Sequence, residues 1–356
     1  MINIITLMEN EKVDIPRKRT TKKKLVITAI ALTILIVGAI VVLPLFSSKT
    51  TEDTVFYIYP NTTEAALKDS LQNYFGEKIA RKVIQLNGTA GKHIENCVGR
   101  YYIPAGTSPI RLWKKLAYKE QQPFKFTFNN LRTLDDFAER AGGAFCFSKD
   151  DMLKCLTSAE TCNEYGVTKE TIPAMLIPDT YEFYWTATPE QVLKKIHAAY
   201  KEFWNDGRRK KAKELGLTLT EVSTLASIVE EETAQPTEKG KVARLYLNRL
   251  EKGIMLQSDP TVKFAVGDFQ LQRVMHKHLE INSPYNTYRN LGLPPGPIRL
   301  PEKTTLDAVL NAPQHDYIFM CAKEDFSGFH NFTASPDEHM ANARRYQAAL
   351  NRLGIK

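Results

Sequence analysis

The hydrophobic and polar positions divide the chain into an apolar N-terminal segment and a longer part built of short alternating elements. Residues 25–46 form a run of 22 residues without a charge. Beyond it, aromatic and β-branched runs typical of strands alternate with segments whose apolar residues recur at helical spacing. Strands are expected at 55–59, 99–104 and 124–128, and helices at 61–71, 76–86, 108–119, 133–141, 149–157, 189–203 and 219–233. This order predicts an α+β fold.

The apolar run at 25–46 is long enough to cross a membrane. At about 1.5 Å per residue, such a helix spans the hydrocarbon core of a bilayer. A buried core helix and a cleaved signal peptide are the alternatives. The apolar part of a signal peptide has about 7–15 residues and ends at a small-x-small site, whereas this run is longer and ends in Leu43-Pro44-Leu45-Phe46. We therefore expect a single N-terminal transmembrane helix that is retained as a signal anchor.

The charge distribution supports this topology. The formal net charge is +8, and residues 1–24 contribute half of it, with seven basic and three acidic side chains. Basic residues before the span predict that the N-terminus stays in the cytoplasm and that the rest of the chain lies outside it. The remaining charge is spread thinly, so no nucleic acid partner is expected. The basic run 208–213 is expected to be a solvated loop.

Four segments follow from this pattern: a cytoplasmic basic tail at 1–24, the transmembrane helix at 25–46, a first domain at 47–165 and a second at 166–356. The first domain begins with a β-α-α-β order that resembles a small LysM-like carbohydrate-binding unit, followed by an adapter region. A plain α+β spacer explains the same pattern. The second domain is a mixed α+β unit and has the residues that indicate chemistry.

No metal or other cofactor is expected. The five cysteines have none of the paired spacings of metal sites, and a disulfide among Cys146, Cys155 and Cys162 stays open. His330 and His339 lie nine residues apart without a matching acidic cluster, which favours a role in a polar network.

The helix expected at 219–233 combines a capping signal with a buried stripe. Thr218 and Glu221 have the spacing of a capping box. Apolar side chains follow at i, i+3, i+4 and i+7, which predicts one buried face; they are Val222, Leu225, Ala226 and Val229.

Three glutamates end this helix. At about 100° per residue, Glu231 points away from the buried stripe and is expected to be exposed to water, whereas Glu230 and Glu232 flank the stripe on its two sides. A carboxyl group beside apolar packing loses hydration, which raises its pKa and keeps it protonated. A general acid needs that property. Surface glutamates near a helix end are the other interpretation, and the pattern alone favours it.

The surrounding segments resemble the YceG-like family of membrane-anchored, MltG-type endolytic murein transglycosylases. The resemblance covers about 176–350 and consists of several motifs in one order: PDT at 178–180, LASIVEEET at 225–233, VARLYLNRL at 242–250, LQSDPTV at 256–262, SPYNTY at 283–288, GLPPGPI at 292–298, and FHNF at 329–332 followed by His339. The family commonly has Lys at the position of Glu231 and Thr at that of Ser258.

The resemblance implies a lytic transglycosylase that cuts the β-1,4 bond between N-acetylmuramic acid and N-acetylglucosamine and leaves 1,6-anhydro ends. It implies Glu230 as the essential catalytic glutamate, so Glu230→Gln is expected to abolish cleavage. It also implies that the enzyme terminates the growth of nascent glycan strands, with peptidoglycan as substrate and peptidoglycan synthases as candidate partners.

The substrate-binding candidates are polar or aromatic residues of the same motifs: Glu232, Gln257, Ser258, Asp259, Tyr285, Asn286 and Tyr288. Glu232 borders the same apolar stripe as Glu230. The other polar groups can bond to sugar hydroxyl or N-acetyl groups, and the tyrosines can stack on sugar rings, although a turn at Asp259 and packing of the aromatic rings are equally open. A muramidase-like hydrolase and a non-catalytic cell-wall binding or scaffold protein are the alternative functions.

Overall fold

The computed structural model describes residues 19–271 and 273–354. Most of the basic tail expected at 1–24 lies outside the described residues. The chain forms two compact units, Met1–Gln122 and Pro123–Lys356, and each is a mixture of helices with one or more small antiparallel sheets. The predicted α+β class is confirmed.

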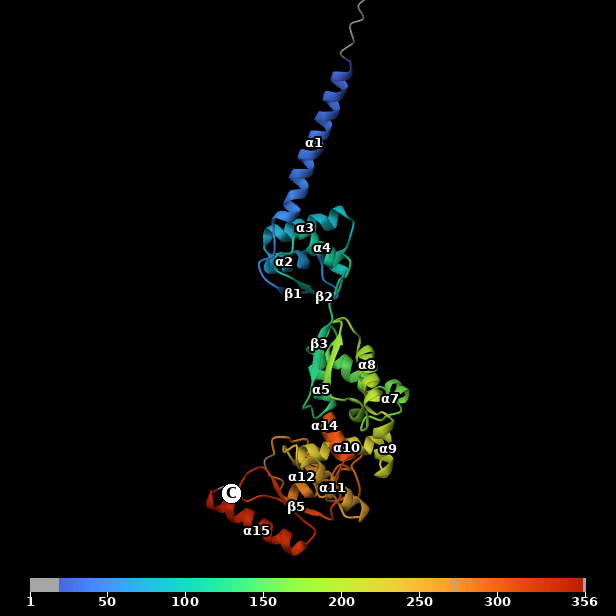
Figure 1. Ribbon diagram of the computed structural model, residues 1–356, viewed down its shortest axis with the longest axis vertical. Coiled ribbons are helices and arrows are strands. Elements are labelled where there is room, and N and C mark those ends of the chain that lie inside the picture. Colours follow the sequence, from blue (N-terminus) through green and yellow to red (C-terminus); the bar gives the residue numbers. More distant parts are fainter. Residues whose placement is uncertain (1–18, 272, 355–356) are drawn as a thin grey trace, which may run out of the picture. The chain divides into compact units, whose positions relative to one another are not determined.

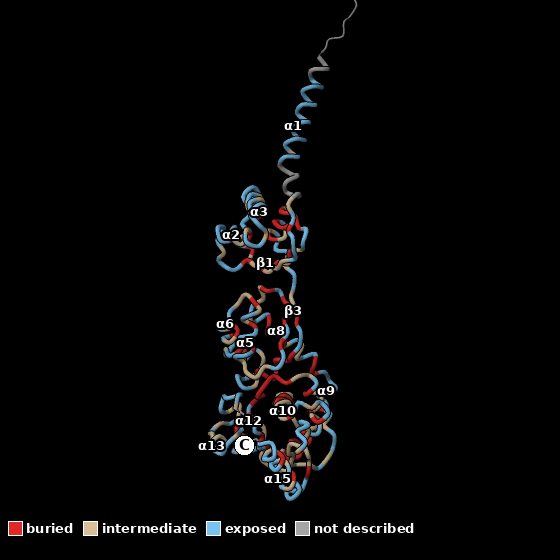
Figure 2. The backbone as a smooth tube through the Cα atoms, turned by 90° about the vertical axis from the view of Figure 1, so that its left-hand side faces the viewer, coloured by how far each residue is buried: buried red, intermediate tan, exposed pale blue. Residues whose placement is uncertain are grey.

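The first unit begins with a long apolar helix. Helix α1 covers Arg19–Ser47, and its stretch Lys23–Ile40 is long and apolar enough to cross a membrane. Almost every residue of that stretch is exposed, as the colouring in Figure 2 shows. An apolar helix without protein packing around it is compatible with a membrane anchor.

The rest of the first unit is a small α+β fold. Strands β1 (Thr54–Ile58) and β2 (Gly99–Ile103) pair antiparallel, with Phe56 opposite Tyr101. Between them lie α2 (Glu64–Phe75), α3 (Glu77–Thr89) and the 3₁₀ turn η1 (Ile94–Asn96), and α4 (Pro109–Ala117) follows. One face of the sheet packs on the helices in a core that includes Phe56, Leu71 and Tyr101. The predicted β-α-α-β order is therefore present.

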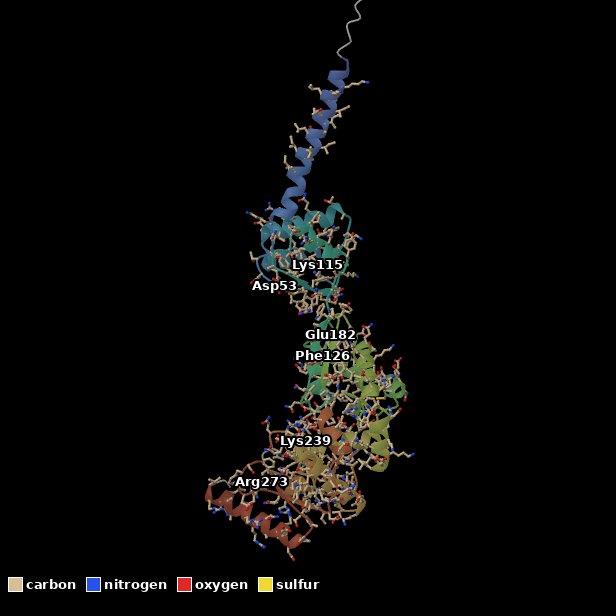
Figure 3. The ribbon with its side chains drawn as sticks, viewed as in Figure 1. Asp53, Lys115, Phe126, Glu182, Lys239 and Arg273 are labelled. Atoms are coloured by element: carbon tan, nitrogen blue, oxygen red, sulfur yellow. The ribbon has the colours of Figure 1, made fainter. Side chains whose placement is uncertain are left out.

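The second unit has two cores. The first belongs to β3 (Phe124–Phe128), α5 (Leu134–Gly142), α6 (Lys149–Thr157), α7 (Ala159–Tyr165), η2 (Ile172–Met175), β4 (Asp179–Phe183) and α8 (Pro189–Phe203). Strands β3 and β4 pair antiparallel; Phe126 and Glu182, labelled in Figure 3, lie on these two strands. Asp179 and Thr180 of the PDT motif begin β4. The sequence placed the end of the first domain near residue 165, but β3 pairs with β4 across that position, and the compact units divide at Gln122.

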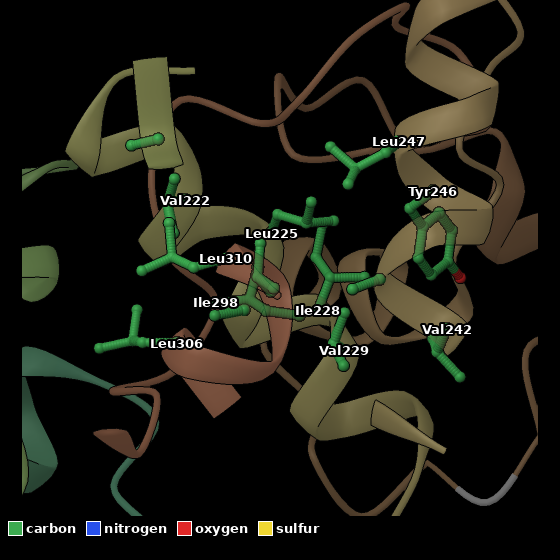
Figure 4. Close-up of a cluster of buried hydrophobic side chains, with 14 of the residues drawn as sticks. Val222, Leu225, Ile228, Val229, Val242, Tyr246, Leu247, Ile298, Leu306 and Leu310 are labelled. Atoms are coloured by element: carbon green, nitrogen blue, oxygen red, sulfur yellow. The ribbon is translucent and has the colours of Figure 1, made fainter. Parts of the chain in front are cut away.

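The second core surrounds helix α10 (Leu219–Glu232). Its other elements are α9 (Asp206–Glu214), α11 (Lys239–Glu251), α12 (Asp259–Val266), α13 (His276–Leu279), α14 (Lys303–Leu310), the hairpin of β5 (Phe319–Ala322) and β6 (His330–Thr333), and α15 (Pro336–Arg352). Figure 4 shows Val222, Leu225 and Val229 of α10 among the apolar side chains of this core. All four residues of the predicted stripe are fully buried.

The basic run 208–213 is a helix, and its prediction as a loop was wrong. The Asn205 side chain caps α9 by accepting a bond from the Arg208 backbone N–H at 3.0 Å. The Arg208 guanidinium pairs with Asp307, at 2.7 Å from Nε to Oδ1, and Ala212 is buried. The disulfide that the sequence left open among Cys146, Cys155 and Cys162 is not formed, since all five cysteines are free.

Candidate active site

Helix α10 begins with the predicted capping box. The Thr218 hydroxyl accepts from the Glu221 N–H at 3.2 Å, and the Glu221 carboxylate accepts from the Thr218 N–H at 2.8 Å. These reciprocal bonds satisfy N–H groups that have no partner inside the helix. With its start capped and one face in the core, the helix holds its C-terminal glutamates in fixed directions.

Glu230 is held by protein groups. Its side chain is 8% exposed and accepts from the Glu302 N–H at 2.9 Å. The Arg299 guanidinium lies 3.8 Å from its other oxygen. Glu230 is not among the residues that line the cavity described below. These contacts suit a structural anchor better than a group that exchanges protons with a substrate.

Glu231 is not exposed to water, contrary to the prediction from helical geometry. Its side chain is 16% exposed and accepts two bonds from Arg132, at 3.0 and 3.1 Å, and one from Arg299 at 2.6 Å. The face opposite the apolar stripe is covered by residues distant in sequence, which helical periodicity does not reveal. A bidentate pair with Arg132 gives this carboxylate fixed geometry.

Glu232 faces a cavity of about 360 Å³. One of its oxygens, Oε1, accepts from the Tyr246 hydroxyl at 2.7 Å and from the Ser258 hydroxyl at 2.5 Å. Among the contacts of the described residues, the second oxygen, Oε2, has no hydrogen-bond partner. The cavity walls come from α10, α11, the start of α12, β5 and α15: Glu232, Leu245, Tyr246, Arg249, Gln257, Asp259, Tyr288, Phe319, Met320 and His339.

Burial raises the pKa of Glu232, and the bonds from Ser258 and Tyr246 oppose this shift without cancelling it. The nearby carboxylate of Asp259 raises it further, while His330 lowers it. A raised pKa keeps a carboxyl group protonated toward neutral pH, as a general acid requires. Of the three glutamates, Glu232 is the one that lines the cavity, and its pKa is raised.

The raised pKa predicts that Glu232 destabilises the fold at neutral pH. Below the carboxyl's ordinary pKa of about 4.5, the group is protonated in both the folded and the unfolded chain and does not change the free energy of unfolding. As pH rises past that value, the group ionises freely only in the unfolded chain, so the free energy of unfolding falls. Glu232→Gln keeps an oxygen that accepts both hydroxyls. We expect the variant to melt at a higher temperature than wild type at pH 7, with the difference shrinking toward pH 4. Equal melting temperatures across this range would contradict the shift.

The predicted substrate-binding residues divide into two groups. Gln257, Asp259 and Tyr288 line the cavity with Glu232, and the Tyr288 hydroxyl donates to Asp259 at 2.6 Å. Ser258 is buried and bonds directly to Glu232. The structure therefore brings these four together around one carboxyl group.

Asn286 and Tyr285 lie elsewhere. Asn286 is fully buried, and its amide donates to the carbonyls of Leu279 and Ile281, both at 2.9 Å. These contacts hold the loop, and a substrate-binding role for Asn286 stays a prediction. Tyr285 packs on Phe264 with ring centroids 4.7 Å apart and lines a separate pocket of about 540 Å³.

Sequence reasoning missed several cavity residues. Tyr246 and Arg249 are three residues apart on α11 and therefore share a face. This spacing was the feature of the sequence that could have predicted them as neighbours. Phe319, Met320 and His339 come from segments far along the chain, and their placement follows only from tertiary packing. His330 bonds to Glu238, at 2.9 Å from its Nδ1. Within the described residues, no group of three or more His, Cys, Asp or Glu side chains is placed to hold a metal ion.

The fold and the site together define an α+β protein with a half-buried glutamate of raised pKa at the wall of a polar cavity. The YceG-like family matches residues 56–345, and the chain belongs to this family. The resemblance noted from the motifs is thereby confirmed.

Curated relatives have a common name. Over 183 residues, the chain is 33% identical to the endolytic murein transglycosylase of Bacillus subtilis, with 51% of this chain and 50% of that protein covered. The protein of the same name from Streptococcus pneumoniae serotype 2 is 30% identical over 151 residues, which cover 41% of this chain and 27% of that protein. The chain thus spans half or less of the length of these relatives.

A solved structure has the same fold. The crystal structure of a YceG-like protein from Listeria monocytogenes matches with a TM-score of 0.55 and 25% sequence identity, over 82% of this chain and 99% of that one.

Proposed function

We propose that this chain is a membrane-anchored lytic transglycosylase. It cleaves the β-1,4 bond between N-acetylmuramic acid and N-acetylglucosamine and leaves a 1,6-anhydro end on the muramyl unit. The observation that carries the proposal is Glu232, a half-buried carboxyl group with a raised pKa at the wall of the cavity. The names of the curated relatives support the same reaction class.

In the first step, protonated Glu232 donates its proton to the glycosidic oxygen while the bond to the muramyl C1 breaks. Tyr246 and Ser258 both donate to Oε1, so Oε2 is the oxygen that is free to carry the proton. In the second step, the Glu232 carboxylate takes the proton of the muramyl C6 hydroxyl, whose oxygen attacks C1. The glutamate ends protonated again, and no water is consumed. Because the nucleophile belongs to the same sugar, no second group is needed to activate it.

This role belongs to Glu232 and replaces the assignment of Glu230 that the motif resemblance implied. Glu230 and Glu232 are both carboxyl groups at the end of one helix, but only Glu232 is among the cavity-lining residues. Gln257, Asp259 and Tyr288 are proposed to bond to the sugars from the cavity wall, whereas Ser258 positions Glu232.

A muramidase-like hydrolase is the second candidate, and Asp259 favours it. This carboxylate lines the same cavity as Glu232 and is the kind of second acid that activates water in hydrolytic glycosidases. In the transglycosylase, Asp259 accepts the Tyr288 hydroxyl and serves binding only.

Product analysis separates these candidates. The full chain in detergent is incubated with purified glycan strands, and the fragments are weighed. We expect fragments one water lighter than those with reducing ends. Reducing ends would favour the hydrolase. If wild type cuts nothing under conditions in which it is folded, the non-catalytic binding or scaffold function is left.

The proposed location of the reaction rests on α1. We propose that α1 crosses the membrane with the N-terminus in the cytoplasm, so that the second unit meets peptidoglycan outside, where it terminates nascent strands near peptidoglycan synthases. The β1-α2-α3-β2 order of the first unit supports a LysM-like carbohydrate-binding role there. Cysteine labelling of exposed residues from one side of sealed vesicles tests the orientation.

A further inference from the structure

The active-site cavity has a buried cation without an anion. Arg244, Arg249 and Arg299 are the three arginines buried among the described residues, with 6–8% of their surface exposed. Arg244 pairs with Glu251 at 2.5 Å, and Arg299 pairs with Glu231 at 2.6 Å. Arg249 lines the cavity, and no carboxylate of the described chain lies within ion-pair distance of it.

The contacts of Arg249 are neutral. Its Nη2 donates to the Gln257 side-chain oxygen at 2.7 Å, and its guanidinium lies 5.8 Å from the centre of the Phe319 ring. Its Nε is buried without a hydrogen-bond partner. Removing a guanidinium from water without a counter-charge is unfavourable. Arg249 lies at the wall of a cavity, so a negatively charged ligand bound there supplies the counter-charge that the protein does not.

A second side chain in the same wall also has a buried nitrogen without a hydrogen-bond partner. His339 also lines the cavity, and its Nδ1 is buried without a partner. Its ring stacks on Phe319, with centroids 5.0 Å apart. Burial, together with the charge of Arg249, lowers the pKa of His339. The imidazole therefore stays neutral and can donate one N–H.

We propose that Arg249, assisted by His339, binds a carboxylate carried by the muramyl unit of the glycan strand and thereby selects muramyl over glucosaminyl units beside Glu232. This inference rests on the proposed function. The two sugars differ in the lactyl arm of the muramyl unit, which ends in a carboxylate when no peptide is attached. An attached peptide with an acidic residue offers the same chemistry from farther out. Arginine prefers such carboxylates because its donors form a planar fork.

Binding measurements on an inactive protein test this. The full chain with Glu232→Gln is titrated calorimetrically with a muramyl-containing tetrasaccharide whose lactyl groups are free carboxylates, and with the same sugar after conversion of these groups to neutral amides. A charge-assisted hydrogen bond is worth about 1.5–3 kcal/mol, so we expect the acid form to bind about tenfold to a hundredfold more tightly. Adding Arg249→Gln should remove this preference.

The matched control is Arg244→Lys in the same background, since Arg244 lies on the same helix and is equally buried but already paired. It should keep the preference for the acid. Equal binding of acid and amide by the Glu232→Gln protein, or equal weakening of both by Arg249→Gln, would overturn the proposal. Because it removes an uncompensated charge, Arg249→Gln should not lower the melting temperature, whereas a purely structural arginine would.

A third sugar identifies the source of the carboxylate. If a peptide-bearing tetrasaccharide binds at least as tightly as the free acid and depends on Arg249, the peptide supplies the charge; if it binds as weakly as the amide, the lactyl group does. Failure of wild type to cut any strand would refute the proposed function, whereas cleavage without discrimination between acid and amide would refute only this inference.

Discussion

Glu232→Gln is expected to lower kcat for glycan cleavage by about a hundredfold to ten-thousandfold, the range attributed to a general acid–base group. The amide has nearly the shape of the carboxyl group, and its oxygen can still accept from Tyr246 and Ser258, which contact Oε1 in wild type. It has no proton to give to the glycosidic oxygen at neutral pH. Cleavage is followed by mass analysis of fragments released from purified glycan strands.

Glu230→Gln is the matched control, because it makes the same chemical change two residues earlier on the same helix. Its amide can still accept from the Glu302 N–H, so we expect cleavage within about tenfold of wild type for the folded fraction. The reverse result, with Glu230→Gln inactive but folded and Glu232→Gln active, would restore the assignment implied by the motifs.

In wild type, kcat should fall as pH rises through the raised pKa of Glu232, since the acid is then ionised.

The local parts of this site could be predicted because they depend on neighbouring residues. The capping box at Thr218, the buried stripe of α10 and the bounds of α8 follow from hydrogen-bonding groups and spacing within one helix. The motif order was sufficient to identify the family. The burial of Ser258 and its contact with Glu232 were not specified, but the motif placed both residues in one site.

The choice between Glu230 and Glu232 could not be made from the sequence of α10. Helical geometry puts the two on opposite flanks of the stripe, and which flank faces a cavity depends on α11, β5 and α15. The burial of Glu231 has the same origin, since its partners Arg132 and Arg299 are distant along the chain. Apolar periodicity shows what is buried against the core but does not show what a polar face meets.

The buried charges on the other side of α10 lead to a large expected effect on stability. Arg299 is 7% exposed and stands between two carboxylates: it donates to Glu231 at 2.6 Å and lies 3.8 Å from Glu230. It also bonds to the Asn130 side chain. Breaking a buried ion pair by removing one partner costs about 3–5 kcal/mol, because the remaining charge is buried without compensation. We expect Arg299→Met to lower the free energy of unfolding of the second unit by about this amount.

Unfolding can be followed by tryptophan fluorescence, since Trp204 is buried in the core around α10. Glu231 retains Arg132 in the variant, so the uncompensated charge is that of Glu230. Adding Glu230→Gln to Arg299→Met should therefore recover a substantial part of the lost stability, although each substitution alone destabilises or is neutral. A loss below about 1 kcal/mol for Arg299→Met, the level of an exposed ion pair, would mean that this network is solvated. In that case Arg299 would not fix the Glu230 side chain, and Glu230 would not be a rigid anchor of the helix beside Glu232.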